Sequence, residues 1–149
     1  MKIFERFFIL LILIAYILKY YNVVGANSLL FFSSIILGVY YFLFSFLVFN
    51  SISLNEVFKA QTYRDMPALH GIISVYSGVI YSSLIFALLM RILGYPYGNS
   101  SLITSGICFI ILFLIIIYKY SKTYKLFFRE QLIRSIIYII MFILHFFLI

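Results

Sequence analysis

Five long apolar runs divide this chain and restrict what it can fold into. They cover residues 3–18, 29–49, 71–90, 102–118 and 132–149, and the second and third contain no charged residue. A helix needs about 20 apolar residues to cross the hydrocarbon core of a bilayer. Because lipid cannot satisfy open backbone groups, we interpret each run as a transmembrane helix. The unbroken apolar stretch at 110–117 lacks the alternation expected of a membrane β-strand.

The composition indicates lipid as the solvent of this fold. Charged residues make up 10% of the chain and hydrophobic residues 66%, with a mean hydropathy of +1.17, whereas soluble domains carry about 25% charged residues. A soluble fold built from this sequence would expose large apolar patches. The net charge of +7 comes from residues near the ends of the runs. We therefore predict membrane lipids as partners and no nucleic acid.

The runs predict an all-α fold in one integral membrane domain, residues 1–149. We expect a bundle of five transmembrane helices, built as two tandem parallel hairpins plus one final helix. The predicted segments are hairpin 1 at about 3–50, a cytoplasmic loop at 51–69, hairpin 2 at about 70–118, a basic loop at 119–131 and a last span at about 132–149.

The distribution of cations predicts the orientation. With a cytoplasmic N-terminus, only Lys19 and Arg91 of the 11 basic residues lie outside. Such an excess of inside cations is typical of cytoplasmic loops. We predict a cytoplasmic N-terminus and an extracytoplasmic C-terminus. Four of the inside cations are expected to contact lipid headgroups, because aromatic residues lie between them: Lys119, Lys122, Lys125 and Arg129.

A repeated frame supports the pair of hairpins. The frame Lys19-x7-Asn27-Ser28-x-Leu30-x-x-Ser33 returns as Arg91-x7-Asn99-Ser100-x-Leu102-x-x-Ser105, an offset of 72 throughout. The repeat makes residues 1–18 the first arm of a hairpin, although their basic and apolar parts also fit a signal peptide. Lys19 and Arg91 are candidates for an outer vestibule, or for anchors that reach the headgroups.

Small and polar residues inside the runs predict helix contacts. The expected packing residues are Gly71, Ser74, Gly78 and Ser82 in the third run and Ser34 and Gly38 in the second. Small residues allow two helices to approach closely, so we predict the tightest contact between these two runs. Three tyrosines well inside their runs need polar partners, and they suggest an intramembrane network or a translocation path: Tyr40, Tyr76 and Tyr81.

The sequence predicts no cofactor and no metal site. His70 and His145 fall near opposite faces of the membrane, and the single Cys108 excludes an intrachain disulfide. The loop from Glu56 to His70 holds acids and bases, but their spacing matches no catalytic motif. Every acid falls outside the apolar interiors, which argues against a proton- or sodium-coupled transporter. We predict no catalytic residue and no enzyme.

The first hairpin resembles a known membrane hairpin. Leu18-Lys19-Tyr20-Tyr21-Asn22-Val23-Val24-Gly25-Ala26 is similar to the N-terminal hairpin of the gliding-motility protein GldL and of small uncharacterised bacterial membrane proteins. There the run reads roughly Lys-(Ile/Leu)-x-His-Trp-Pro-Gly-Ala. The second copy, Arg91 to Gly98, has Tyr95-Pro96 where Trp-Pro would stand. The resemblance implies a hairpin fold and the bacterial inner membrane. The membrane glutamate linked to the motor role of GldL has no counterpart in residues 29–49.

These observations favour a structural or accessory component of an inner-membrane assembly, with a membrane-protein partner or a second copy of the chain. The alternative is a small channel or carrier for an anionic or small polar solute. Another alternative is a five-span respiratory complex subunit, because Val75 to Ile80 is similar to part of one. A membrane enzyme that uses the Glu56 to His70 loop is a further class.

Overall fold

The chain folds into a bundle of long helices, seen here in a computed structural model that describes residues 2–59, 61–64, 66–123 and 126–148. The described residues are 86% helical overall and contain no strand, which confirms the predicted all-α class. The elements are α1 (Lys2–Tyr20), α2 (Ala26–Phe49), a 3-10 turn (Leu54–Glu56), α3 (Gln61–Arg64), α4 (Ala68–Ile92), α5 (Gly98–Thr123) and α6 (Leu126–Leu148).

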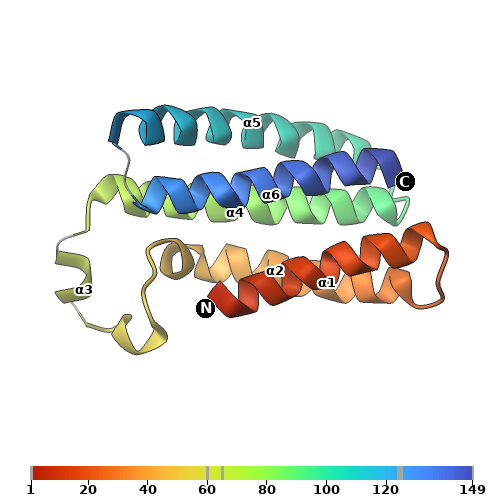
Figure 1. Cartoon of the computed structure of the whole chain (residues 1–149), viewed down its shortest axis with the longest axis horizontal. Helices are drawn as coiled ribbons and strands as arrows, with labels where there is room; N and C mark the ends of the chain where they lie inside the picture. Colours follow the sequence, from red (N-terminus) through yellow and green to blue (C-terminus); the bar gives the residue numbers. More distant parts are fainter. Residues whose placement is uncertain (1, 60, 65, 124–125, 149) are drawn as a thin grey trace.

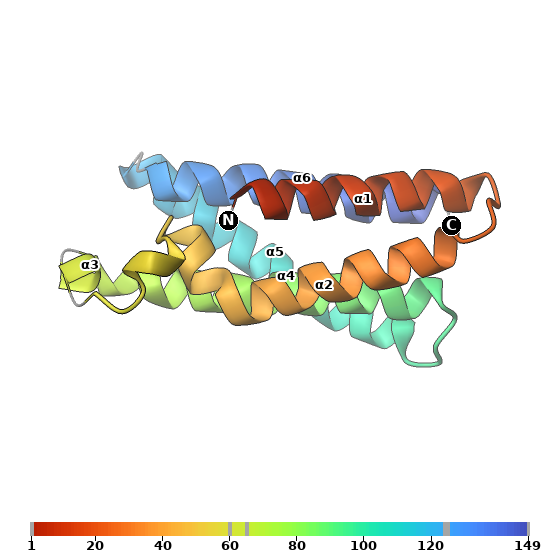
Figure 2. The same ribbon diagram turned by 90° about the horizontal axis from the view of Figure 1, so that it is seen from below.

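The five long helices pack side by side in one bundle (Figure 1). In chain order α1 packs on α2, α2 on α4, α4 on α5 and α5 on α6, and α6 returns to α1. Figure 2 shows α6 alongside α1, with both helices beginning at the end of the bundle that also holds α3. We name this the loop end. The opposite end, where both hairpin links lie, is the turn end.

Three helices of the described chain are long and apolar enough to cross a membrane: α2, α4 and α5. The predicted number of five spans is therefore not supported by length and composition. The first predicted span, α1, carries Lys2, Glu5, Arg6 and Lys19 within 19 residues, and such charges are costly in hydrocarbon. The last predicted span, α6, begins with Arg129, Glu130 and Arg134, and most side chains after Ile143 lie outside the described residues.

The two hairpin links have the same backbone structure. α1 ends at Tyr20 and α4 at Ile92, while α2 begins at Ala26 and α5 at Gly98, so both boundaries keep the 72-residue offset. Five link hydrogen bonds of 2.9–3.2 Å recur at that offset, written donor first: 21–17, 22–19, 23–18, 26–23 and 29–25 match 93–89, 94–91, 95–90, 98–95 and 101–97. Asn22 (φ 54°) and Gly94 (φ 75°) occupy the same left-handed position.

The most extensive helix contact joins α2 to α4. At its centre Gly78 of α4 lies against the side chain of Ser45, and a Cβ at Gly78 would come within 2.8 Å of the Tyr41 carbonyl oxygen. Gly38 of α2 leaves room for the ring of Phe86, which a Cβ would approach to 2.7 Å. Glycine at position 78 therefore allows the α2 and α4 backbones to approach closely, whereas Gly38 makes room for a side-chain ring.

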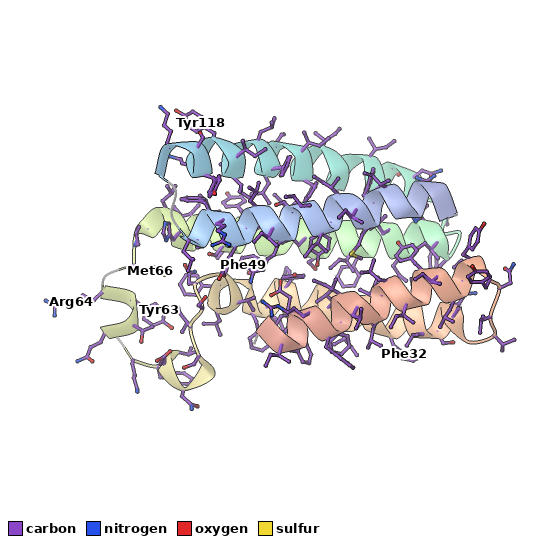
Figure 3. The ribbon with its side chains drawn as sticks, viewed as in Figure 1. Phe32, Phe49, Tyr63, Arg64, Met66 and Tyr118 are labelled. Atoms are coloured by element: carbon purple, nitrogen blue, oxygen red, sulfur yellow. The ribbon has the colours of Figure 1, made fainter. Side chains whose placement is uncertain are left out.

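The 3-10 turn, α3, the end of α5 and the start of α6 lie at the loop end (Figure 1). The carboxylate of Glu56 accepts a hydrogen bond from the Ser53 backbone N–H at 3.1 Å. The pKa of Glu56 is lowered mainly by a hydrogen bond from the Ser53 side chain and, to a smaller extent, by the bond from this N–H. The predicted basic loop at 119–131 is mostly helical, because α5 continues to Thr123 and α6 begins at Leu126. Figure 3 shows Arg64 pointing away from the bundle.

Candidate functional site

An ion pair lies inside the bundle near the loop end. Nε of Arg134 donates to Oε1 of Glu5 at 2.7 Å, and Nη2 donates to Oε2 at 3.2 Å. Glu5 is 3% exposed and Arg134 7%. The hydroxyl of Tyr41 donates to the same Glu5 Oε1 at 2.6 Å, and the guanidinium carbon lies 5.0 Å from the centre of the Phe49 ring. One carboxylate thus joins α1, α2 and α6.

Helical periodicity places both charged residues on packing faces. Glu5 shares a face of α1 with Ile9, Ile12 and Tyr16, all of them buried, because residues three or four apart lie on one side of a helix. Arg134 belongs to the corresponding stripe of α6. The buried members of that stripe are Gln131, Arg134, Ser135, Tyr138, Met141 and His145.

Glu5 was predicted to lie at a span boundary, and the structure shows that its side chain is buried in the bundle. Tyr41, the carboxylate's second partner, lies about 12 Å along α2 from the end at Phe49, at 1.5 Å per residue. Arg134 was expected among the cytoplasmic cations and is buried as well. The sequence signal that could have predicted this burial is helical spacing. Both residues continue the periodicity of the apolar positions that follow them.

Three tyrosine rings fill the centre of the bundle beside the ion pair. Tyr81 and Tyr138 stack with centroids 4.8 Å apart, and Tyr41 lies 5.6 Å from Tyr81 and 5.9 Å from Tyr138. The Tyr81 hydroxyl shares a 2.8 Å hydrogen bond with Ser135 Oγ, and Ser135 donates to the Gln131 carbonyl at 3.0 Å. We name Tyr41, Tyr81 and Tyr138 the tyrosine cluster.

The structure does not bring the three predicted network tyrosines together. Tyr81 is buried, but its hydroxyl bonds to α6 rather than to α2. Tyr40 is buried against Phe4 and Phe44, at centroid distances of 4.8 and 5.8 Å. Tyr76 is 64% exposed on the outer face of α4. The distance of each tyrosine from the ends of its apolar run does not show which side of the helix its ring occupies.

Lys19 and Arg91 both lie at the turn end, one at the end of each first arm. Nζ of Lys19 donates to the carbonyl oxygen of Ile92 at 3.2 Å, which links hairpin 1 to the last turn of α4. Arg91 is half-buried. The ring of His145 lies at this end too, edge-on to Tyr16 at 6.2 Å.

The predicted packing residues lie at buried positions. Each is buried in α2 or α4: Ser34, Gly38, Gly71, Ser74, Gly78 and Ser82. Ser74 accepts a hydrogen bond from the side-chain amide of Asn50 at 2.9 Å, which adds a polar link between α2 and α4.

The predicted headgroup residues lie near the loop end. Lys119 and Lys122 belong to the last turns of α5, and Lys122 Nζ lies 4.9 Å from the centre of the Tyr118 ring. Figure 3 shows Tyr118 on the outer side of α5. Arg129 is exposed at the start of α6, and Lys125 lies outside the described residues.

The side chains proposed for a catalytic loop do not form a compact site. Glu56 and His70 line a hollow of about 570 Å³ at the loop end. However, Glu56 is bonded to Ser53, and the His70 ring lies flat on Phe127 at 4.2 Å. Arg64 is exposed, and Asp65 lies outside the described residues.

A cleft of about 280 Å³ opens beside the buried ion pair, between α1 and α6. We name it the α1–α6 cleft. Its lining combines five charged and four apolar residues: Glu5, Arg6, Arg129, Glu130, Arg134, Ile9, Leu126, Ile133 and Ile137.

No family model matches this chain, and no curated protein or solved structure matches it significantly. The chemistry of the site must therefore be argued from its own residues.

The buried polar groups can hold helices together, and they provide polar surface inside an apolar bundle. Within the described chain no group of three or more His, Cys, Asp or Glu residues is placed to hold a metal ion. The Glu5 carboxylate accepts three hydrogen bonds from two side chains, so in this arrangement its oxygens are occupied by protein donors. Glu5 and Arg134 both line the α1–α6 cleft, which is open to the surface.

Proposed function

We propose that this protein is a non-enzymatic structural or accessory component of an inner-membrane assembly. The observation that carries the proposal is the way its buried polar groups are used. Glu5, Tyr41 and Arg134 bond to one another across three helices, and Tyr81 bonds to Ser135 across two. Buried ionic groups favour one arrangement of helices. A bundle held in one arrangement is suited to a structural role.

The same proposal includes a five-span arrangement. α1 is 19 residues long, which at 1.5 Å per residue is about 28 Å and matches the hydrocarbon core. Pairing of Glu5 with Arg134 lowers the cost of placing α1 and α6 in lipid, because the two charges compensate each other. The excess of cations at the loop end supports a cytoplasmic loop end, with the turn end outside.

Tandem duplication of one hairpin is part of the proposal. It is supported by the recurrence of link hydrogen bonds at the 72-residue offset, and by Ser33 and Ser105, whose hydroxyls donate to the carbonyls of Leu29 and Ser101 at 2.6 and 2.8 Å. α1 and α4 run in the same direction (Figure 1), as parallel copies require. The likeness to the bacterial gliding-motility hairpin is consistent with such a module and supports the bacterial inner membrane as location.

We expect the assembly partner to pack on α5. The spanning part of α5 is only 28% buried, compared with 61% for α4. Its exposed face carries Ser100, Thr104 and Cys108, spaced four residues apart. Small residues at this spacing permit close approach of a second helix. The hydroxyl of Ser100 donates to the carbonyl of Tyr97 just before α5, and that of Thr104 donates to the Ser100 carbonyl within α5, so the face tolerates an apolar neighbour.

Mild detergent extraction and partner identification test this function. We expect the full-length protein to migrate as a complex with another membrane protein or with itself. Cys108 is the single cysteine and is exposed, so oxidation in native membranes reports contact between two copies through α5. A Cys108→Ser variant is the matched control. Recovery of only a monomer, with no cross-linked species, would contradict the proposal.

A channel or carrier is the second candidate, and one observation favours it. The buried face of α6 is polar along much of its length, from Gln131 and Arg134 to His145. Intramembrane ionisable residues often line solute paths. Flux of anions and protons into proteoliposomes tests this candidate. A leak that Glu5→Gln or Arg91→Ala abolishes would favour it over the scaffold.

A further inference from the structure

The α1–α6 cleft combines cationic and apolar surface at one end of the bundle. Arg6 and Arg129 are exposed at its mouth, and Arg134 forms part of its inner wall. The apolar wall is made by four residues along the two helices: Ile9, Leu126, Ile133 and Ile137. A ligand that fills this cleft must carry an anionic group and an apolar part.

The charges that line the cleft leave it positive. Glu5 is neutralised by its two hydrogen bonds from Arg134. Glu130 Oε2 lies 3.7 Å from Arg134 Nη1, so the second acid also faces this guanidinium. Arg6 and Arg129 then add two cations, and the five charged residues sum to one net positive charge. An anion is therefore favoured over a cation at the mouth.

One nitrogen of the Arg134 guanidinium lies at ion-pair distance from Glu130 but makes no hydrogen bond. Nη1 of Arg134 is buried and makes no hydrogen bond to any described residue. Its other two nitrogens both donate to Glu5. A buried donor without a hydrogen-bonded acceptor is costly, so a hydrogen bond from this nitrogen to a ligand oxygen would be favourable. Arginine is well suited to phosphate oxygens, because its planar donors match their geometry.

The cleft lies toward the loop end, where α1 and α6 begin. α1 and α6 run in the same direction, and α6 begins beyond the start of α1 (Figure 2). The positive ends of both helix dipoles therefore face the loop end, where they favour an anion. From there an acyl chain can follow the exposed side chains of Ile133, Ile136 and Ile140 along α6. A free phosphate would gain nothing from this apolar wall.

We propose that the α1–α6 cleft is a specific binding site for one anionic phospholipid. Arg6 and Arg129 hold its phosphate at the mouth, Arg134 Nη1 donates to a phosphate oxygen, and the isoleucines contact the first part of an acyl chain. The site is independent of the assembly role, because it does not involve α5.

Native mass spectrometry of the full-length protein, released from detergent with added lipid, tests the site. We expect the first dioleoyl phosphatidylglycerol to bind about tenfold more tightly than dioleoyl phosphatidylcholine. The double variant Arg6→Gln/Arg129→Gln should lose about tenfold in phosphatidylglycerol affinity, since each cation near an anionic headgroup contributes roughly fivefold or less. Both arginines are exposed, so the fold should persist, and circular dichroism checks this.

The matched control is Lys119→Gln/Lys122→Gln, which removes two cations at the same end of the bundle, on α5. We expect this control to retain tight binding of the first phosphatidylglycerol. Equal affinity for the two lipids, or an equal loss in the control and cleft variants, would overturn the proposal. Soluble glycerol phosphate should not displace the lipid at millimolar concentration. Displacement would assign the cleft to a free phosphate ester instead and overturn the lipid site.

Discussion

The two hairpins have the same link and differ at the opposite end. At the turn end their backbone hydrogen bonds correspond one to one. At the loop end, the residue that corresponds to Glu5 is Ser77, and the one that corresponds to Arg6 is Gly78. Glu5 pairs with Arg134, whereas Ser77 Oγ is buried without a hydrogen-bond partner among the described residues. The link is determined by local sequence, and the far end by neighbouring helices.

The difference reflects the places of α1 and α4 in the bundle. α4 contacts α2 on one side and α5 on the other, so Gly78 must be small where α2 crosses it. α1 contacts α2 and α6, and it leaves Arg6 exposed at the cleft. Two hairpins with the same link can thus differ elsewhere, since α4 lies at the centre of the bundle and α1 supplies a charged surface.

The largest expected effect comes from breaking the ion pair that only hairpin 1 possesses. Replacing Arg134 by Met leaves Glu5 as a buried charge without its partner, which should cost about 3–5 kcal/mol of stability. The double variant Glu5→Gln/Arg134→Met should recover most of this loss. Ser77→Ala, at the equivalent position of hairpin 2, should change stability by less than about 0.5 kcal/mol. SDS titration followed by circular dichroism measures all three, and equal effects of Arg134→Met and Ser77→Ala would refute the comparison.

The second largest expected effect distinguishes α4, the inner helix of hairpin 2, from α5, its outer helix. Gly78→Ala should cost about 2 kcal/mol, because its Cβ meets Ser45 and the Tyr41 carbonyl. Gly106→Ala in α5 should be neutral or stabilising by up to about 1 kcal/mol, since its Cβ meets nothing within 4 Å. The same titration measures both variants. A loss at Gly106 as large as that at Gly78 would show that α5 is not the open arm.

A smaller effect tests whether the two links are equivalent. Gly94→Ala should cost about 1 kcal/mol, because φ there is 75° and a Cβ disfavours that region. Asn22→Gly, at the matching position with φ 54°, should be neutral or slightly stabilising. Thermal unfolding in detergent micelles compares them. If Gly94→Ala is harmless, the left-handed geometry of the second link is wrong.

The smallest effect concerns the bond between the two hairpins at the turn end. Lys19→Met removes the hydrogen bond to the Ile92 carbonyl and should cost about 0.5–1.5 kcal/mol. Lys122→Met, which removes an exposed cation of α5, is the control and should stay within about 0.5 kcal/mol. The chain has no tryptophan, so tyrosine fluorescence is a suitable probe for the unfolding transition. Equal effects would mean that Lys19 acts only as a headgroup anchor.

The sequence predicted the parts of the fold that depend on local patterns. The long apolar runs predicted helices, and the Lys19 and Arg91 frames predicted links with a common offset. The predicted number of five spans is not supported, because apolar length does not show how charges such as Glu5 are accommodated. The close approach of α2 and α4 was predicted from small residues. Residues such as Gly78 and Ser45 can be recognised in the local sequence, without knowledge of which distant residue they contact.

The ion pair was not predicted, because its partners are 129 residues apart and neither belongs to a motif. Charged residues near span ends usually reach the headgroups, and that ordinary outcome was the basis for assigning Arg134 to the loop. Only the packing of α6 against α1 decides that Arg134 points inward. Likewise, Tyr40, Tyr76 and Tyr81 have similar depth in sequence, and their burial depends on which neighbour each helix face meets.

The long separation of Glu5 and Arg134 has a consequence for synthesis of the chain. α1 is synthesised before α6, so the Glu5 carboxylate lacks its guanidinium partner until Arg134, 129 residues later in the chain, has been made. An incomplete chain therefore exposes an unpaired Glu5 carboxylate in the membrane, and this charge distinguishes it from the complete bundle. We expect chains truncated before residue 134 to be degraded faster than the full protein, and Glu5→Gln to slow the loss of the truncated form, as pulse-chase labelling would record.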